Sequence, residues 1–157
     1  MKIPSLRLRL PATEAGRTRA AERFEKFADD RGLPKRVRSE VLVILDEILA
    51  NIGRHAWRRP AGRRIGFSAS IEGGFLELRF TDDGRAFDVL ARPDPDTSAP
   101  LERRPIGGVG ILIVKKLTDA QHYERRRGRN RLTLRKRIGV GKRETGNGKR
   151  SDGNSRV

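Results

Sequence analysis

The sequence contains no cysteine, which excludes disulfide bonds, thiolate metal sites and cysteine nucleophiles. It also lacks any apolar run near the roughly 20 residues that a membrane-spanning helix needs. Its first residues, Met1-Lys2-Ile3-Pro4, do not form the apolar centre of a signal peptide. We therefore expect a protein of the reducing cytoplasm, with no contact to a membrane.

Apolar side chains are scarce, at 35% of 157 residues, whereas charged residues reach 36%. The chain length fits one domain of ordinary size. The low apolar fraction allows only a modest core. We therefore expect one folded domain and some residues outside it.

Acidic residues are almost missing from the C-terminal end. Residues 125–157 contain 13 lysines and arginines but only two acidic residues, so most of the net charge of +16 lies there. Such an end suits nucleic-acid binding, but it has no aromatic side chain on which bases could stack. We therefore favour a solubilising tail and do not expect nucleic acid as a partner. Residues 139–157 are rich in Gly, Lys, Arg, Asn and Ser, and their composition predicts disorder.

Hydrophobic periodicity predicts a strand and two helices in the first part of the chain. Residues 5–10 alternate leucine with arginine, as in a half-buried strand. Thr13 is a candidate N-cap for a helix to about Arg31, which Gly32 would end. A second helix is predicted from about Pro34 to Trp57.

Two hairpins are predicted in the second part. The first joins residues 64–71 to 75–81 through a glycine-containing turn, and the second joins residues 121–125 to 130–138. Between them, residues 89–105 contain four prolines, which predicts a long loop of the kind that forms a lid. A short helix is predicted at residues 111–117.

The order of these elements is strand, helix, helix, hairpin, loop, helix, hairpin. Strands joined mainly as hairpins, with helices gathered on one face, are typical of an α+β fold. We therefore predict a two-layer α/β sandwich with a mostly antiparallel mixed sheet.

The first candidate motif lies on the second predicted helix, where Glu47 and Asn51 stand one turn apart. An amide oxygen there could hold a hard cation, beside a carboxylate that accepts a proton. The simpler alternative is a polar surface pair on an amphipathic helix. His55 continues the same row, and we interpret it and Trp57 as structural.

Two further candidate motifs follow strands or open a helix. Asp82 and Gly84 come at a strand end, where a carboxylate can accept a hydrogen bond from a ligand amine; a plain turn is the alternative. Gly107, Gly108 and Gly110 open the short helix, where backbone N–H groups favour phosphate. This motif lacks the Lys-Ser/Thr of a Walker loop, and a tight loop-to-helix joint is its alternative.

The order and separation of the three motifs resemble the ATP-binding fold of the GHKL superfamily, which includes histidine-kinase catalytic domains, gyrase B, Hsp90 and MutL. The resemblance covers about residues 5–138 and is greatest to the stand-alone anti-sigma factor serine kinases. The matching patterns are Glu47-x-x-x-Asn51-x-x-x-His55-Ala56-Trp57, Asp82-x-Gly84-x-x-Phe87-Asp88 and Gly108-x-Gly110-Ile111.

The resemblance implies a role for each motif. Asn51 would coordinate the Mg²⁺ that bridges the ATP phosphates, and Glu47 would be the general base on the acceptor serine. Asp82 would bind the adenine amino group, with Gly84 beside it. The phosphates would receive backbone hydrogen bonds from Gly108 and Gly110.

The chain departs from the family pattern at two places. Ala86 replaces the second glycine of the Asp-x-Gly-x-Gly motif. Asn130 stands where the final strand commonly carries threonine, so one polar contact near adenine is left open.

The resemblance further implies an anti-sigma factor that binds a sigma factor and phosphorylates, on serine, an anti-anti-sigma partner of the STAS fold. It would use ATP and Mg²⁺ and form a homodimer, with a kinase domain at residues 1–138 and a basic tail at 139–157. Two alternatives remain. One is an ATP-binding module without phosphoryl transfer, for which Glu47 would be unnecessary. The other is a basic nucleic-acid binder whose glycine motifs are turns.

Overall fold

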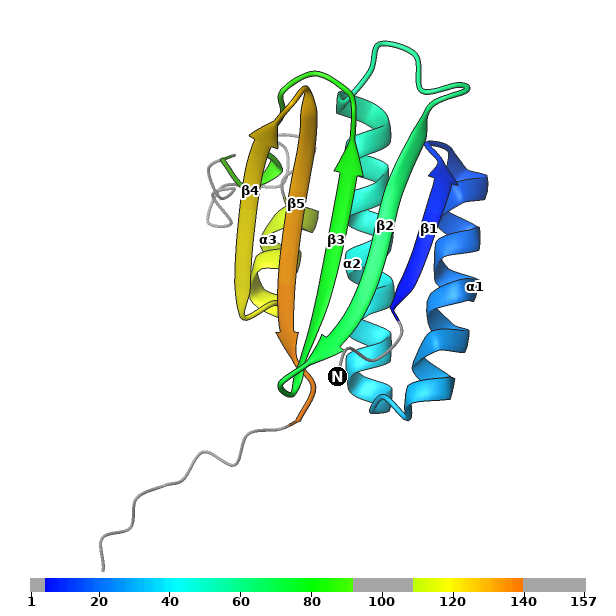
Figure 1. Ribbon diagram of the computed structural model, residues 1–157, viewed down its shortest axis with the longest axis vertical. Helices are drawn as coiled ribbons and strands as arrows, with labels where there is room; N and C mark the ends of the chain where they lie inside the picture. Colours follow the sequence, from blue (N-terminus) through cyan, green and yellow to red (C-terminus); the bar gives the residue numbers. More distant parts are fainter. Residues whose placement is uncertain (1–4, 92–108, 140–157) are drawn as a thin grey trace, which may run out of the picture.

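The computed structural model describes residues 5–91 and 109–139. In this part of the chain, three α-helices cover one face of a five-stranded sheet (Figure 1). The elements are β1 (Leu6–Pro11), α1 (Glu14–Arg31), α2 (Lys35–His55), β2 (Arg64–Glu72), β3 (Phe75–Asp82), the 3₁₀ turn η1 (Val89–Ala91), α3 (Val109–Leu117), β4 (Ala120–Arg126) and β5 (Arg129–Arg137).

The sheet has the strand order β1-β2-β3-β5-β4. Each described pair of neighbouring strands is antiparallel, so the sheet is antiparallel throughout where we predicted a mostly antiparallel mixed one. The predicted two-layer α+β architecture is confirmed. β5 lies between β3 and β4, so the second hairpin adds two strands to the sheet and pairs with β3 through β5.

The core lies between the sheet and the helices. Alternate strand residues such as Leu78 and Phe80 point into it and are buried. α2 contributes Ile44 and Ile48, and α1 contributes Phe24, each fully buried. Side chains three or four positions apart form one stripe on a helix, so burial of this stripe sets the rotation of α2 about its axis.

The helix boundaries follow the predictions to within two residues. Thr13 occupies the N-cap position of α1, although its side chain makes no capping hydrogen bond. Gly32 ends α1 with a φ of 62°, a left-handed conformation that favours glycine. α2 ends at His55 rather than Trp57, and α3 begins at Val109 rather than at residue 111.

Lys136 ties the two layers together. Although it is charged, it is buried on the inner face of β5, with 5% of its surface exposed. Its Nζ donates a hydrogen bond to Leu117 O at 2.6 Å and forms an ion pair with Glu40. The end of α3 is thereby attached to both β5 and α2, because a buried ammonium group requires such partners.

Some of the predicted features fall outside the described residues. These include Gly108, most of the predicted lid and all of the 139–157 tail except Gly139. Of the predicted lid, the structure describes η1 at its start. In the described ranges, the helices are too short or too polar to cross a membrane.

The close approach of α1 to β1 requires Gly16. A Cβ at this position would lie 1.8 Å from Pro11 O, a backbone atom that cannot rotate away. We expect Gly16→Ala to lower the free energy of unfolding by about 1–3 kcal/mol, the usual cost of overpacking. Urea unfolding measures this change. Gly139→Ala is the matched control because nothing lies within 4 Å of its Cβ position. Equal losses in the two variants would contradict the prediction.

Candidate active site

Asp82 ends β3 and is buried, with 6% of its surface exposed. Its Oδ1 accepts two hydrogen bonds, from the N–H of Gly84 and from Nδ2 of Asn130, each at 2.9 Å. In the described part of the chain, no donor contacts its Oδ2. One carboxylate oxygen therefore fixes the side chain, and the other is left to accept a hydrogen bond from a ligand.

A small pocket lies against Asp82, between the end of α2 and the sheet. Its polar lining comes from Asp82 and Asn130, and its remaining walls are Ile52, Ala56, Phe80, Phe87, Val89, Tyr123 and Leu132. The cavity volume of about 20 Å³ has room for about one water molecule. A purine ring would therefore enter only if a wall moved. Of the lining residues, Val89 begins the predicted lid and Phe87 lies two positions before it.

Burial raises the pKa of Asp82, because removing a carboxylate from water disfavours its charged form. The hydrogen bonds from Asn130 and Gly84 and the charge of Arg125 act in the opposite direction. The net rise in pKa means that desolvation outweighs these contacts. A desolvated carboxylate gains more from a ligand donor than one in water does.

Asn130 holds Asp82 in place and is itself held by several groups. The β3–β5 register puts Asn130 directly opposite Asp82. Its Oδ1 accepts hydrogen bonds from Tyr123 Oη at 2.5 Å and Arg125 Nη1 at 3.1 Å, and its Nδ2 also donates to Arg85 O at 2.7 Å. Asn130 thus makes a polar contact with Asp82 from the position where the family pattern commonly carries threonine.

Sequence reasoning missed Tyr123 and Arg125 as supports of this network. The signal was present in the second predicted hairpin, whose pairing places Tyr123 and Arg125 beside the strand position of Asn130. This pairing alone does not connect the two residues to Asp82, because the register between β3 and β5 could not be derived from either hairpin alone.

Gly84 lets the end of β3 approach the end of α2. A Cβ on Gly84 would lie 2.4 Å from Ala56 O and 2.5 Å from Ala56 Cβ. The next residue, Arg85, donates its N–H to Ala56 O at 2.9 Å. Packing against the end of the helix therefore requires a glycine here, independently of the ligand role predicted for Gly84.

Asn51 lies on α2 with 5% of its surface exposed. Its Nδ2 donates to the backbone oxygen of Glu47 at 2.8 Å, which fixes the orientation of the amide. No described donor contacts Asn51 Oδ1, so the oxygen suits a hard cation. The described residues contain no group of three His, Asp or Glu side chains that could hold a metal ion. Any Mg²⁺ here would take most of its ligands from phosphates and water, as Mg²⁺ usually does.

The first and third motifs meet where α2 contacts α3. A Cβ on Gly110 would lie 1.9 Å from Glu47 Oε2, so the half-exposed carboxylate fits against the glycine backbone. Asn51 lies one turn further along α2, and Ala56, which directly follows the end of the helix, forms part of the pocket wall. The helix therefore brings the described residues of all three motifs to one side of the molecule; Gly107 and Gly108 lie outside the described residues.

Comparison with known proteins relates this arrangement to a family. Residues 10–136 match the family described as the histidine kinase-like ATPase domain. The chain is similar to the serine/threonine-protein kinase BtrW of Bordetella bronchiseptica, with 29% identity over 133 residues, which cover 85% of this chain and 92% of the relative.

Two solved structures share the fold. One contains the RsbU and RsbW domains of Rv1364c from Mycobacterium tuberculosis, with a TM-score of 0.62 and 15% identity over 87% of this chain and 33% of that one. This chain thus spans about a third of that protein. The other is the SiaB–SiaC complex from Pseudomonas aeruginosa, with a TM-score of 0.55 and 15% identity over 83% of this chain and 88% of that one.

The raised pKa of Asp82 predicts how Asp82→Asn alters stability with pH. The native state holds this proton more tightly than the unfolded state, whose pKa is near 3.8. The contribution of Asp82 to stability is therefore lost as the pH rises through its native pKa. Asparagine keeps the Oδ1 acceptor but cannot ionise. We expect the stability of Asp82→Asn relative to wild type to increase as the pH rises from about 4 to 7.

Urea unfolding of both proteins across this pH range measures the difference in unfolding free energy. The unfolding free energy of Asp82→Asn minus that of wild type could instead be independent of pH or fall as the pH rises. Either result would show that burial does not disfavour the charged form of Asp82 in the native state.

Proposed function

The chain belongs to the family of histidine kinase-like ATPase domains, and from this premise we propose that it is a Mg-ATP-dependent protein serine kinase and anti-sigma factor. The observation that carries the proposal is the placement of Glu47 against Gly110, one helical turn from the buried Asn51. A proton acceptor and a cation ligand then lie beside a backbone that suits phosphate.

Adenine recognition would rest on Asp82. Its Oδ2 accepts a hydrogen bond from the amino group of the base, and Asn130 keeps the carboxylate in the required orientation. The apolar walls, including Phe87 and Val89, cover the ring faces after they move outward to admit it. Guanine carries an oxygen where adenine has its amino group, so this contact favours adenine.

Phosphate binding would combine Asn51 with the start of α3. Asn51 Oδ1 would be the protein ligand of Mg²⁺, which would supply charge neutralisation to the phosphates. The N–H of Gly110 donates to phosphate at the positive end of the helix dipole. Lys136 would have an indirect role, because it attaches the other end of α3 to the sheet.

Glu47 would act as general base when a partner serine reaches the γ-phosphate. Its Oε2 takes the proton of the serine hydroxyl as the serine oxygen forms a bond to phosphorus. The bond from the γ-phosphorus to the bridging oxygen breaks, and ADP leaves. Phosphoryl transfer depends mainly on positioning and charge neutralisation, so these few groups are sufficient.

We propose a STAS-fold anti-anti-sigma protein as the phosphorylated partner and a sigma factor as the second partner, in the cytoplasm. Support comes from the serine/threonine kinase BtrW and from the SiaB–SiaC complex, in which a chain of this fold assembles with another protein. Phosphate on the partner would weaken its binding through charge and bulk at the interface. A homodimer is proposed on the family resemblance alone.

The role of Glu47 distinguishes a kinase from an ATP-binding module. We expect Glu47→Gln to keep the affinity for Mg-ATP but to slow phosphate transfer by about 10²–10⁴-fold, because general-base catalysis is lost. Asn51→Ala should lower both affinity and transfer. Calorimetry with Mg-ATP measures binding, and labelled ATP with a purified STAS partner measures transfer.

Each possible result of this experiment has a clear meaning. Full-speed transfer by Glu47→Gln would disprove its assignment as the base. Binding of Mg-ATP by wild type without any transfer to the partner would leave the ATP-binding module. Absence of nucleotide binding by wild type would refute the site itself.

Asn130 provides a separate test of the adenine end. Asn130→Ala removes one donor to Asp82 and takes away the side-chain acceptor of Tyr123 and Arg125, although Arg125 keeps its hydrogen bond to Gly84 O. We expect the Kd for Mg-ATP to rise by at least about tenfold, the effect of losing one hydrogen bond to a charged group. Calorimetry measures it. Asn130→Thr is the control, since its hydroxyl can donate to Asp82 and should keep most of the affinity. Unchanged affinity in Asn130→Ala would show that Asp82 needs no such support.

A further inference from the structure

The face of the sheet that the helices do not cover is dominated by arginine. The strands lie in front of the helices in Figure 1, so this open face is turned to the viewer. On β5 the outward positions carry Arg129, Arg131, Arg135 and Arg137, and all four are exposed. A strand places alternate residues on one face, so these side chains form one row along β5, interrupted by Thr133 at its centre.

Arginines continue across the other four strands. The strand registers place Arg7, Arg9, Arg64, Arg79 and Arg126 on the same face. The described strands thus present nine arginines here, against three glutamates, Glu72, Glu77 and Glu124. The excess of positive charge is confined to one face and is spread over its whole width.

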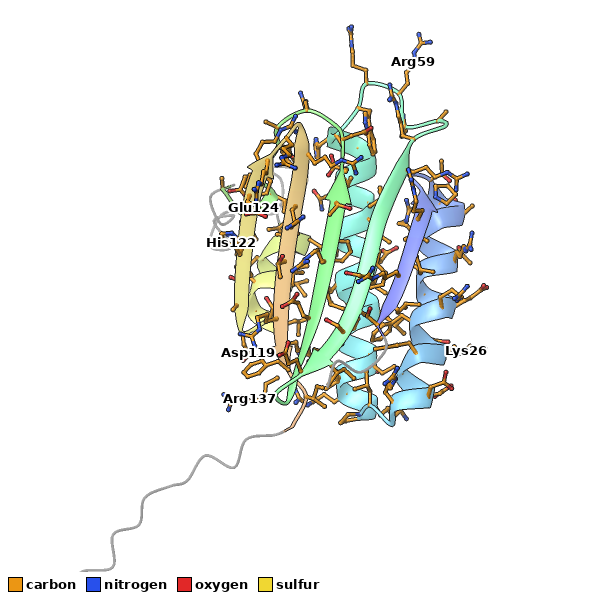
Figure 2. The ribbon with its side chains drawn as sticks, in the orientation of Figure 1. Lys26, Arg59, Asp119, His122, Glu124 and Arg137 are labelled. Atoms are coloured by element: carbon orange, nitrogen blue, oxygen red, sulfur yellow. The ribbon has the colours of Figure 1, made fainter. Side chains whose placement is uncertain are left out.

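Most of this positive charge is not neutralised. Glu77 pairs with Arg79 at 3.0 Å, and Glu124 pairs with Arg131 at 3.2 Å. In the described part of the chain, none of the other seven arginines of this face forms an ion pair. Figure 2 shows Glu124 on β4 and Arg137 at the end of β5, among the side chains that project along these strands.

The face is hollowed in two places. One hollow of about 380 Å³ lies over β1, β2 and β3 and includes Arg7, Ser68, Ser70 and Arg79. Another of about 530 Å³ lies at the β4–β5 turn, where arginines and Thr81 form much of the lining. Each hollow contains guanidinium and hydroxyl groups, whose hydrogen bonds phosphate oxygens can accept. Glutamates also line them, Glu72 and Glu77 in the first hollow and Glu124 in the second.

This composition argues against a protein partner or a second copy on the open face. Among its described residues, Phe75 is the one large apolar side chain, and the guanidinium carbons of Arg135 and Arg137 lie 4.5 and 5.4 Å from its ring centre. Protein interfaces need an apolar core with few charges. A second copy would place arginine opposite arginine, so a homodimer would need another surface.

We propose that this arginine face binds the phosphate backbone of a double-stranded nucleic acid. Alternate strand residues are about 6.6 Å apart and neighbouring strands about 4.8 Å apart, which gives a dense grid of charge. A duplex presents one negative charge per about 1.7 Å. Among the described residues of this face, His122 is the one exposed aromatic ring, and the half-buried Phe75 lies against Arg135 and Arg137. There is no row of rings on which successive unpaired bases could stack, so duplex suits the face better than single strands.

The proposed duplex site is separate from the nucleotide site. Asp82 and Asn130 point to the helix side of the sheet, where the pocket lies. Binding of duplex therefore does not depend on the proposed kinase activity. Asn51→Ala should leave duplex binding unchanged, so failure of one proposal is distinguishable from failure of the other.

The test measures fluorescence anisotropy of a short labelled DNA duplex with the full chain over a series of salt concentrations. The face variant carries Arg9→Gln, Arg129→Gln and Arg135→Gln. We expect it to bind more weakly and to reduce the slope of log K against log salt by about three, because each of the three arginines would neutralise one phosphate in the wild type.

A matched control removes the same charge from the helix side, through Arg19→Gln, Arg23→Gln and Lys26→Gln on α1. Lys26 is labelled in Figure 2, away from the sheet. This control should keep the wild-type slope. The thermal shift caused by Mg-ATP and the circular dichroism should be the same in all three proteins, which separates loss of binding from loss of fold.

Four results would overturn the proposal. The face variant could keep the wild-type slope of log K against log salt. The control variant could lose as much duplex affinity as the face variant. Replacement of Lys142, Arg143 and Lys149 by glutamine could abolish binding while the face variant retains it, which would assign binding to the tail. Polyglutamate or single-stranded DNA could displace the duplex at equal charge concentration, which would indicate an acidic protein or unpaired strands.

Discussion

Burial of the apolar stripe of α2 is the constraint on which the rest of the structure depends. Ile44, Ile48 and Ile52 face the sheet, and their packing sets the rotation of the helix. Asn51 is then held beneath the surface and Glu47 is held at the contact with α3. Without that packing, two polar residues one turn apart would be an ordinary pair on a helix surface. The core therefore determines the direction in which the functional groups point.

A second constraint comes from the cost of burying Asp82. A desolvated carboxylate is tolerated only with hydrogen-bond partners, and here they come from Gly84 and from Asn130 on another strand. The β4–β5 hairpin is thus more than an extension of the sheet. Tyr123 and Arg125 hold Asn130, and Asn130 holds Asp82, so distant residues determine which carboxylate oxygen stays available to a ligand.

Local patterns in the sequence were sufficient to predict the helices, the strands and the two-layer architecture, because each element is formed by residues close together in the chain. Alternating leucines predict β1, and Gly32 marks the end of α1. Glu47, Asn51 and Asp82 were found because their motifs are local and resemble a known family; their roles stay predictions. Asn130 was not assigned, since its role depends on the register between strands that are 48 residues apart at this contact. The partners of Lys136 were not predicted for the same reason, because Glu40 and Leu117 are far from it in sequence and close only in three dimensions.

The two faces of the sheet arise from the same alternation of inward and outward strand residues, but different physical constraints act on each face. Inward positions are limited by packing, as Leu76, Leu78 and Phe80 on β3 show. Outward positions face no such limit and accept any polar residue. A face selected only for solubility would mix both signs of charge. On β5 the outward residues are instead four arginines and one threonine. Packing requires no such bias, and mutual repulsion opposes it. A ligand with many negative charges turns that repulsion into attraction, which is the physical reason to look for one on this face.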